Sequence, residues 1–184
     1  MRPNTFEDIV GQDHLVGENG IIRKMLNSNS LFSFILYGNP GCGKTTIAEA
    51  TCKSSGFKWF KFNASTDNKE TLKQIITEAA FLDNAIIIVD EIHRMKKDIQ
   101  DYLLPYVENG TVIMIGLTTV NPYHSVNPAI RSRCHVYRLN DLTKDCDKYI
   151  DSVNRVKASG QPLTTAKKQQ MDLEVRKRRI LLEY

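Results

Sequence analysis

Cysteine is scarce in this sequence, and its spacing suggests no metal or disulfide site. The chain has four cysteines in 184 residues, and no two of them form a Cys-x-x-Cys pair. Zinc knuckles need such pairs, and disulfide-bonded domains need a denser framework of cysteines. The pattern therefore argues against both classes, and it is typical of a protein that works in a reducing cytoplasm.

Long apolar runs are also missing. No run approaches the roughly 20 residues that cross a bilayer, and the first eight residues contain no apolar signal core. We therefore expect no membrane partner and no secretion. The sequence has no internal repeat and no low-complexity tract. Its apolar fraction of 41% and charged fraction of 25% instead fit one well-cored globular domain with an appendage.

The net charge of +4 is unevenly distributed. Residues 155–184 contain eight basic and three acidic residues, whereas the rest of the chain contains 17 basic and 18 acidic residues. A basic tail on a near-neutral core permits contact with nucleic acid. A solvated basic helix face explains the same charge pattern equally well.

Strand-like and helix-like runs alternate between residues 21 and 139. The expected strands are residues 33–37, 57–62, 85–89, 111–117 and 134–139, and the expected helices are residues 21–27, 44–54, 68–82, 97–106 and 128–132. Such alternation predicts βαβ crossovers, hence an α/β fold with a doubly wound, five-stranded parallel sheet flanked by helices. Residues 1–20 are expected to form an ordered loop, and a final helix is expected at residues 165–182.

The most informative segment follows the first expected strand. It reads Gly38, Asn39, Pro40, Gly41, Cys42, Gly43, Lys44 and Thr45, and fits the pattern G-x-x-x-x-G-K-[S/T] at every fixed position. Its glycines let successive backbone N–H groups point at an anion, and the helix that continues through Thr46 adds its positive N-terminus. Lys44 can then reach the β- and γ-phosphates of a nucleotide, and the Thr45 hydroxyl can hold Mg²⁺. The alternative is a glycine-rich turn that only happens to carry a lysine.

Two carboxylates follow the buried run at residues 85–89. Asp90 and Glu91 stand where ligands bind in open α/β sheets, at the carboxyl end of a strand. Asp90 suits the orientation of a Mg²⁺ shell, and Glu91 suits a general base that activates water. A pair of solvated acids at a strand end is the alternative. His93 is assigned nothing beyond a possible polar contact.

Polar groups after the fourth and before the fifth expected strand complete the candidate set. The segment Thr118 to Asn121 offers hydroxyl and amide groups to an attacking water or a γ-phosphate, although strand-end capping explains it by itself. Arg131 and Arg133 suit phosphate contacts and transition-state charge, although an isolated surface pair usually has no such role.

Taken in order, these segments resemble a known family. They comprise the opening Arg2-Pro3 and the run from Phe6 to Gln12, then GNPGCGKT, Asn63-Ala64-Ser65, VDEIHR, GLTTVNP and RSRC. The set resembles an AAA+ ATPase of the clamp-loader branch. More narrowly, it is similar to the replication-associated recombination protein A family, over roughly residues 1–143. The fold expected from this resemblance is the P-loop NTPase fold, with ATP and Mg²⁺ as cofactors.

The resemblance also implies roles for single residues. Ile9 and Val10 would pack on the adenine ring, Asn63 would be a polar switch that restrains Glu91, and Thr119 would be the sensor, with Asn121 as a second candidate. Arg133 would be an arginine finger inserted into the site of a neighbouring subunit, so hydrolysis would depend on assembly. The implied partners are neighbouring ATPase subunits, single-stranded or forked DNA, and single-strand-binding protein. The implied activity is ATP hydrolysis in replication-fork maintenance, recombination or repair, in the nucleoid.

The last part of the sequence departs from that family. Members continue into a helical lid that carries a second sensor arginine within a Gly-Asp-x-Arg stretch, and no such stretch follows Thr143. We therefore predict an AAA+ nucleotide-binding core at residues 1–142 and a helical basic tail, unlike the lid, at residues 143–184. Weakened hydrolysis is expected without a lid. Two other functions stay open: a nucleotide-binding assembly module with little turnover, and a subunit of a clamp loader or Holliday-junction motor.

Overall fold

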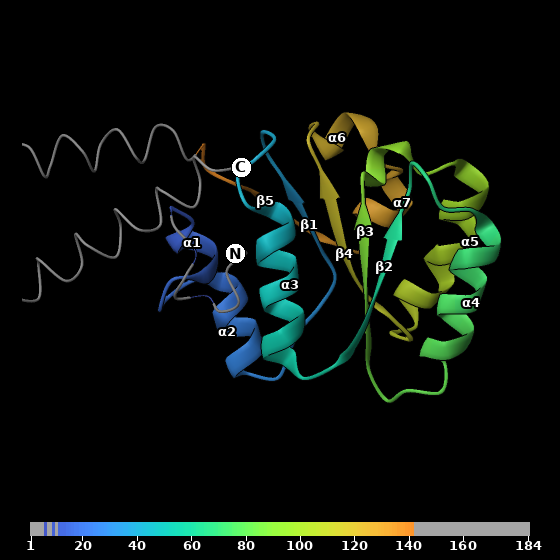
Figure 1. Ribbon diagram of the computed structural model, residues 1–184, viewed down its shortest axis with the longest axis horizontal. Helices are drawn as coiled ribbons and strands as arrows, with labels where there is room; N and C mark the ends of the chain where they lie inside the picture. The colour runs from blue at the N-terminus through green and yellow to red at the C-terminus, as the bar shows by residue number, and fades with distance from the viewer. Residues whose placement is uncertain (1–5, 7–8, 10, 142–184) are drawn as a thin grey trace, which may run out of the picture.

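Five strands form one parallel sheet in the computed structural model, which describes residue 6, residue 9 and residues 11–141 (Figure 1). The strands are β1 (Phe34–Tyr37), β2 (Lys58–Asn63), β3 (Ala85–Asp90), β4 (Ile113–Thr118) and β5 (His135–Arg138). Their order across the sheet is β2-β3-β4-β1-β5, and every pairing is parallel. The predicted fold class is therefore confirmed.

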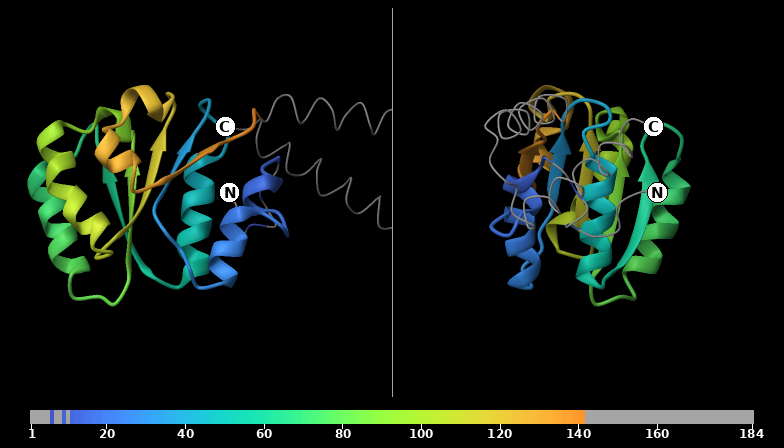
Figure 2. Two further views of the ribbon diagram at one scale, coloured as in Figure 1. Left: turned by 180° about the vertical axis from the view of Figure 1, so that it is seen from behind. Right: turned by 60° about the vertical axis from the view of Figure 1, so that its left-hand side comes forward.

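Helices cover both faces of the sheet, as the two views of Figure 2 also show. The α-helices are α1 (Asp13–Val16), α2 (Ile21–Asn27), α3 (Lys44–Ser55), α4 (Lys69–Ala79), α5 (Lys97–Glu108), α6 (Pro122–Ser125) and α7 (Pro128–Arg131), and η2 (Ile92–Arg94) is a 3₁₀ turn. Helices α1, α2 and α3 lie on one side of the sheet, and α4, α5 and α7 lie on the other. The sheet is therefore doubly wound.

The core consists of two apolar layers separated by the sheet. Successive strand residues point to opposite faces, so Phe34 and Leu36 join the layer under α2 and α3, whereas Ile35 joins the layer under α4 and α5. Strand β3 follows the same rule: Ile86 and Ile88 pack in one layer and Ile87 in the other. Burial on both faces explains why β3 is an unbroken β-branched run.

The structure corrects three details of the expected elements. The segment expected to be a loop up to residue 20 contains α1, a single turn. Helix α5 passes through Pro105 and ends at Glu108, although the proline has no N–H and so removes one hydrogen bond from the last part of the helix. Helix α6 was not expected; Asn121 caps it by accepting from the Tyr123 N–H, and Pro122 occupies its first position.

The predicted boundary, linker, final helix and basic tail, from residue 142 to residue 184, lie outside the described residues. Among the described residues, no helix has the length and apolar character that crossing a membrane requires.

Candidate functional site

The sheet brings the predicted site residues to one edge. In a parallel sheet all carboxyl ends of the strands lie on the same side. Asn63 pairs in register with Asp90 at the ends of β2 and β3, and Tyr37 pairs with Thr118 at the ends of β1 and β4. Gly38, which opens the glycine-rich loop, directly follows β1. The glycine-rich loop after β1 and the carboxylates after β3 therefore lie on the same side of the sheet, separated by the end of β4.

Three glycines of the loop have positive φ angles. Gly41 (φ 78°) and Gly43 (φ 95°) adopt left-handed conformations that are strained for other residues. Gly38 has φ 157°, and a Cβ there would lie 3.1 Å from the Cys42 Sγ and 3.2 Å from the Leu139 Cβ. Glycine is therefore required at Gly41 and Gly43 by the left-handed backbone. At Gly38 it is required both by the positive φ angle and by the close packing of Cys42 and Leu139.

The backbone of the loop fits an anion. Helix α3 begins at Lys44, so its first N–H groups have no partner inside the helix. Among the described residues, none accepts a hydrogen bond from the backbone N–H groups of Gly41, Gly43, Lys44 or Thr45. These donors at a helix N-terminus are what the phosphates of ATP require.

The Lys44 ammonium lies over the loop. Its Nζ donates to the carbonyl oxygens of Gly38 (2.8 Å) and Asn39 (2.9 Å). The positive charge is thus held beside the outward-facing N–H groups. Asn39, in turn, donates from its side chain to Asp141 (3.3 Å).

A buried amide ties this loop to the segment after β5; it belongs to Gln12, the last residue of the segment 9–12 that the family resemblance places against the adenine ring. The Gln12 side chain is 1% exposed. Its Nε2 donates to the carbonyls of Cys42 (3.3 Å) and Asn140 (3.0 Å), and its Oε1 accepts from the Asn140 N–H (3.0 Å). The amide therefore links three parts of the chain that are far apart in sequence. Its role as a link could not be read from the residues around it.

The two carboxylates after β3 differ in conformation. Asp90 ends the strand, and its Oδ1 accepts from the Glu91 N–H (3.0 Å). Glu91 has φ 53° and ψ 42°, one of two non-glycine residues with positive φ among the described residues. For a residue with a Cβ this conformation costs about 1 kcal/mol or more. The turn η2 starts directly after it.

That turn brings His93 back against the site. The His93 Nε2 lies 3.4 Å from the Glu91 Oε2, and the His93 Nδ1 lies 3.0 Å from the Thr118 Oγ1. The expectation of a polar contact at His93 was thus right but incomplete, because the imidazole contacts the ends of two strands. The sequence signal that could have predicted the contact with Glu91 was the short Glu-x-His spacing directly after a strand.

Asn63 and Thr119, the predicted switch and sensor, also lie at this edge. The Asn63 Oδ1 accepts from the Ser65 N–H (2.8 Å), so it shapes the turn after β2. Thr119 follows Thr118 at the end of β4. Their roles toward a nucleotide stay predictions.

Arg133 lies at the opposite edge of the sheet. It precedes β5, whose first residue, His135, pairs with Phe34 at the start of β1. From Phe34 to Gly38 the chain rises roughly 13 Å. The structure therefore does not bring Arg133 to the glycine-rich loop of its own chain; instead its guanidinium pairs with Glu108.

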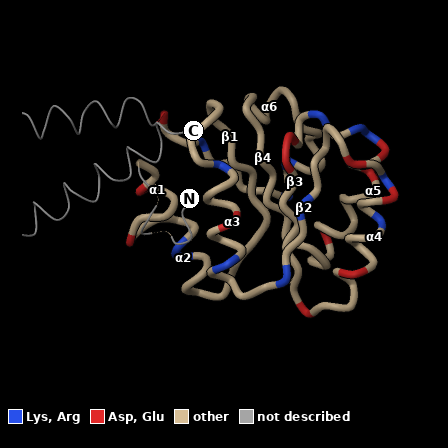
Figure 3. Tube along the Cα trace, in the orientation of Figure 1, with Lys and Arg blue, Asp and Glu red and all other residues tan. Residues whose placement is uncertain are grey.

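The other predicted residues have varied surroundings. The Arg131 guanidinium donates to the Tyr123 carbonyl (2.8 Å) and lies over the Tyr123 ring, which ties α7 to α6. Ile9 packs against the layer under α2 and α3. Val10 lies outside the described residues. Basic and acidic residues alternate along α4, whereas α5 carries one lysine and three acidic residues (Figure 3).

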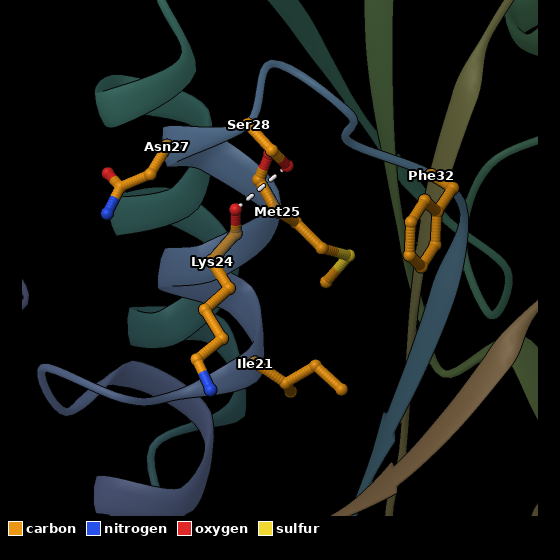
Figure 4. Close-up of a pocket in the computed structure, with 6 residues that line it drawn as sticks. All are labelled: Ile21, Lys24, Met25, Asn27, Ser28 and Phe32. Carbon is orange, nitrogen blue, oxygen red and sulfur yellow. Dashed lines mark hydrogen bonds between the residues drawn. The ribbon is translucent and has the colours of Figure 1, made fainter.

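An open pocket of about 530 Å³ lies beside α2 (Figure 4). Its walls come from α2 and from the segment before β1, and they include none of the predicted site residues. They are Ile21, Lys24, Met25, Asn27, Ser28 and Phe32. The pocket is therefore separate from the candidate site.

Thr45 and Asp90 supply a hydroxyl and a carboxylate at the same edge of the sheet. The described residues hold no cluster of three or more His, Cys, Asp or Glu side chains suited to a metal. Mg²⁺ suits such a sparse site, because it is usually bound by one or two protein groups together with substrate phosphates. The residues present thus fit a nucleotide with its Mg²⁺.

Comparison with known proteins agrees with this geometry. Residues 34–142 match the ATPase family associated with various cellular activities (AAA). Replication-associated recombination protein A of Bacillus subtilis is 49% identical over 148 residues, which are 80% of this chain and 35% of that protein. ATPase WRNIP1 of Dictyostelium discoideum is 41% identical over 149 residues, which are 79% of this chain and 17% of that protein. The chain thus spans about a third or less of the length of these relatives.

Solved structures give the same fold. The Thermotoga maritima RuvB Holliday junction branch migration motor superposes with a TM-score of 0.63 at 20% identity, covering 76% of this chain and 48% of that one. This likeness supports the fold alone. The family match covers more than half of the chain, and it includes the glycine-rich loop, the two carboxylates and Arg133. The chain belongs to the AAA family of ATPases.

Proposed function

We propose that this chain binds ATP with Mg²⁺ and hydrolyses it to ADP and phosphate, as the ATPase part of a protein that acts on DNA in replication-fork maintenance, recombination or repair. One observation carries the chemistry: the glycine-rich loop and the Asp90-Glu91 pair lie at the same edge of the sheet, on either side of β4. The DNA role is supported by the names of the similar proteins.

Each residue has a defined task in this proposal. The N–H groups from Gly41 to Thr45 receive the phosphates, and Lys44 neutralises their charge. Mg²⁺, held by Thr45 and oriented by Asp90, would stabilise the charge that develops on the phosphates. Glu91 accepts the proton of the attacking water. In this proposal Thr119 contacts that water, and Asn63 restrains Glu91.

Arg133 acts on a second subunit in this proposal. Because it lies at the sheet edge away from its own loop, only a neighbour's nucleotide is within its reach. Hydrolysis then requires assembly, and an isolated chain turns over slowly.

The test separates binding from hydrolysis. The dissociation constant of a fluorescent ATP analogue and the rate of phosphate release are measured for the chain and its variants. Lys44→Ala should lose binding, whereas Glu91→Gln should bind ATP and lose hydrolysis. Lys73→Ala, at an exposed position of α4, is the matched control for lost charge. Full turnover by Glu91→Gln would refute the base assignment, and ATP binding without phosphate release by the parent chain would favour a binding module.

The DNA role needs a separate experiment. Phosphate release is measured with no DNA, with single-stranded DNA, with forked DNA and with blunt duplex of the same length. The proposal predicts that single-stranded or forked DNA stimulates phosphate release more than duplex DNA does. In the cell, we place this activity at the nucleoid. Equal rates with all four would count against it. Adding single-strand-binding protein to the forked DNA tests that partner.

A further inference from the structure

We propose that His93 is a positioning residue that holds the Glu91 carboxylate in place by connecting it to Thr118 at the end of β4. The proposal rests on the proposed hydrolysis, in which Glu91 is the base. It adds a side chain that touches neither nucleotide nor water and acts through Glu91.

The contacts define a directed chain of donors. A carboxylate only accepts, so the His93 Nε2, 3.4 Å from the Glu91 Oε2, carries the imidazole proton. In a neutral imidazole the Nδ1 is then an acceptor, so the Thr118 hydroxyl donates to it at 3.0 Å in preference to the Val120 carbonyl oxygen, which lies farther away at 3.3 Å. The Thr118 Oγ1 itself accepts from the Val120 N–H at 3.2 Å. Each donor thus points toward Glu91.

Burial makes these contacts specific. Thr118 is 1% exposed and the His93 side chain 16%, whereas the Glu91 side chain is 34% exposed, so the shielding is greatest at the Thr118 end. Polar groups that are shielded from water form stronger hydrogen bonds than exposed ones and cost more when they are left unpaired. Among the described residues, His93 is the side chain that contacts the Glu91 carboxylate. The Asn63 amide oxygen, the other candidate at this edge, is used by the Ser65 N–H.

The turn that carries His93 is itself held against β4. Ile92 is fully buried, and a Cβ at Gly116 would lie 3.0 Å from the Ile92 Cδ1. The missing side chain at Gly116 therefore makes the room that Ile92 fills. Because Gly116 lies two residues before Thr118 on the same strand, this packing sets the distance between His93 and Thr118.

The arrangement has a chemical consequence for a general base. An imidazole held 3.4 Å from Oε2 leaves Oε1 to accept the proton of water, and it limits rotation of the carboxylate. Errors of about 1 Å in such positions cost up to about 100-fold in rate. The link also ties Glu91 to the strand that ends beside Thr119, so a movement of that strand would move the base.

The kinetic test uses paired variants. His93→Ala and Thr118→Val should each lower kcat about 10- to 100-fold, with the dissociation constant for ATP little changed. Thr118→Ser keeps the hydroxyl and should retain most of the rate. Because the two residues act through one connection, the double variant should be no slower than the slower single variant. His124→Ala, an exposed histidine in α6, is the control.

A second readout does not depend on turnover. The ¹⁵N shifts of the His93 imidazole report which nitrogen carries the proton and whether each is hydrogen-bonded. We expect protonation at Nε2 in the parent chain, a change at Nδ1 in Thr118→Val and a change at Nε2 in Glu91→Gln. If neither variant alters these shifts, His93 does not connect the two residues in solution, and the proposal is overturned.

The outcomes separate this proposal from the hydrolysis on which it rests. If Glu91→Gln loses hydrolysis and His93→Ala retains the parent rate, only the positioning role fails. If Glu91→Gln retains hydrolysis, the base assignment fails whatever His93 does. An increased kcat in His93→Ala, or additive losses in the double variant, would also overturn the positioning role.

Discussion

Arg133 and Glu108 form a two-point ion pair at the sheet edge farthest from the glycine-rich loop. The Arg133 Nε and Nη2 lie 2.9 Å and 2.8 Å from the same Glu108 Oε1. Their side chains are 53% and 39% exposed, so the pair contributes about 1 kcal/mol or less to stability. The main effect of the pair is therefore on the orientation of the Arg133 side chain. It holds the guanidinium at the surface, where it is accessible to a neighbouring subunit.

The first prediction concerns action across subunits. Arg133→Ala should abolish the ATP hydrolysis that DNA stimulates and leave ATP binding unchanged. Glu91→Gln should also abolish hydrolysis and leave binding unchanged. When these two inactive variants are mixed, an Arg133→Ala subunit with an intact base can receive the arginine of a Glu91→Gln neighbour. Phosphate release should therefore recover in the mixture.

The control for this experiment is Lys97→Ala, which removes an exposed cation from α5, the helix that carries Glu108. Its rate should match that of the parent chain. No recovery in a mixture that sedimentation shows to be co-assembled would contradict action in trans. Every interface at which an Arg133→Ala subunit supplies the base and a Glu91→Gln neighbour supplies the arginine should contain a complete site.

The strands and the loop could be predicted because their signals are local. Ala85 to Val89 is a run that suits burial on both faces, and the pattern from Gly38 to Thr45 needs a strand before it and a helix after it. Once the strands are parallel, the residues at their ends must share one edge, so Lys44, Asp90 and Glu91 could be grouped without coordinates.

The remaining contacts depend on distances that a sequence does not contain. Gln12 bonds to Asn140, 128 positions away, and nothing near either residue signals the other. His93 reaches Thr118 only because Glu91 adopts a left-handed conformation and starts a tight turn. A glutamate rarely does so, because its Cβ makes that conformation unfavourable.

The second prediction concerns Gln12. Gln12→Leu keeps most of the side-chain volume and leaves the Cys42 and Asn140 carbonyls and the Asn140 N–H without this partner. The free energy of unfolding should fall by about 3 kcal/mol, because buried polar groups that lose their partners cost 1–3 kcal/mol each. The ATP dissociation constant should rise, since the loop loses its tether at Cys42.

Urea unfolding and ATP titration measure the two effects of Gln12→Leu. Thr77→Ala, which removes an exposed hydroxyl from α4, should change stability by less than about 0.5 kcal/mol. A normal ATP affinity in Gln12→Leu would mean that the buried amide stabilises the fold without shaping the loop.

The third prediction concerns alkaline pH. Burial raises the pKa of the Cys134 thiol to about 12. Burial also raises the pKa of Cys52 to about 12, and the nearby negative charge of Glu49 adds to the shift. In the unfolded chain a thiol has a pKa of about 8.5. Because the folded pKa is the higher one, this stability is fully present below about pH 8.5 and is lost as the pH rises toward 12.

The loss from each thiol approaches about 1.4 kcal/mol per pH unit above pH 8.5. Unfolding free energies of the parent chain and of Cys134→Ala, measured by urea between pH 7 and pH 9.5, isolate the contribution of one thiol. The variant should be less stable at pH 7, and the gap should narrow as the pH rises. A gap that stays constant with pH would argue against the raised pKa.

The last prediction concerns the contact between Gly116 and Ile92. In Gly116→Ala the new Cβ would lie 3.0 Å from the Ile92 Cδ1 and 3.2 Å from the Ile35 Cγ1, so both isoleucines would have to shift by a few tenths of an ångström. Overpacking of this kind costs about 1–3 kcal/mol of stability. It should also push η2 away from β4, so the His93 ¹⁵N shifts should change and kcat should fall with little change in ATP affinity.

A compensating variant distinguishes this packing effect from a general loss of folding. Ile92→Val removes the Cδ1 that the new Cβ would meet. The double variant Gly116→Ala/Ile92→Val should therefore be more stable than Gly116→Ala alone, and its His93 shifts should return toward those of the parent chain. If the double variant is instead less stable than Gly116→Ala, the conflict lies with Ile35, and the turn that carries His93 is not held by Gly116.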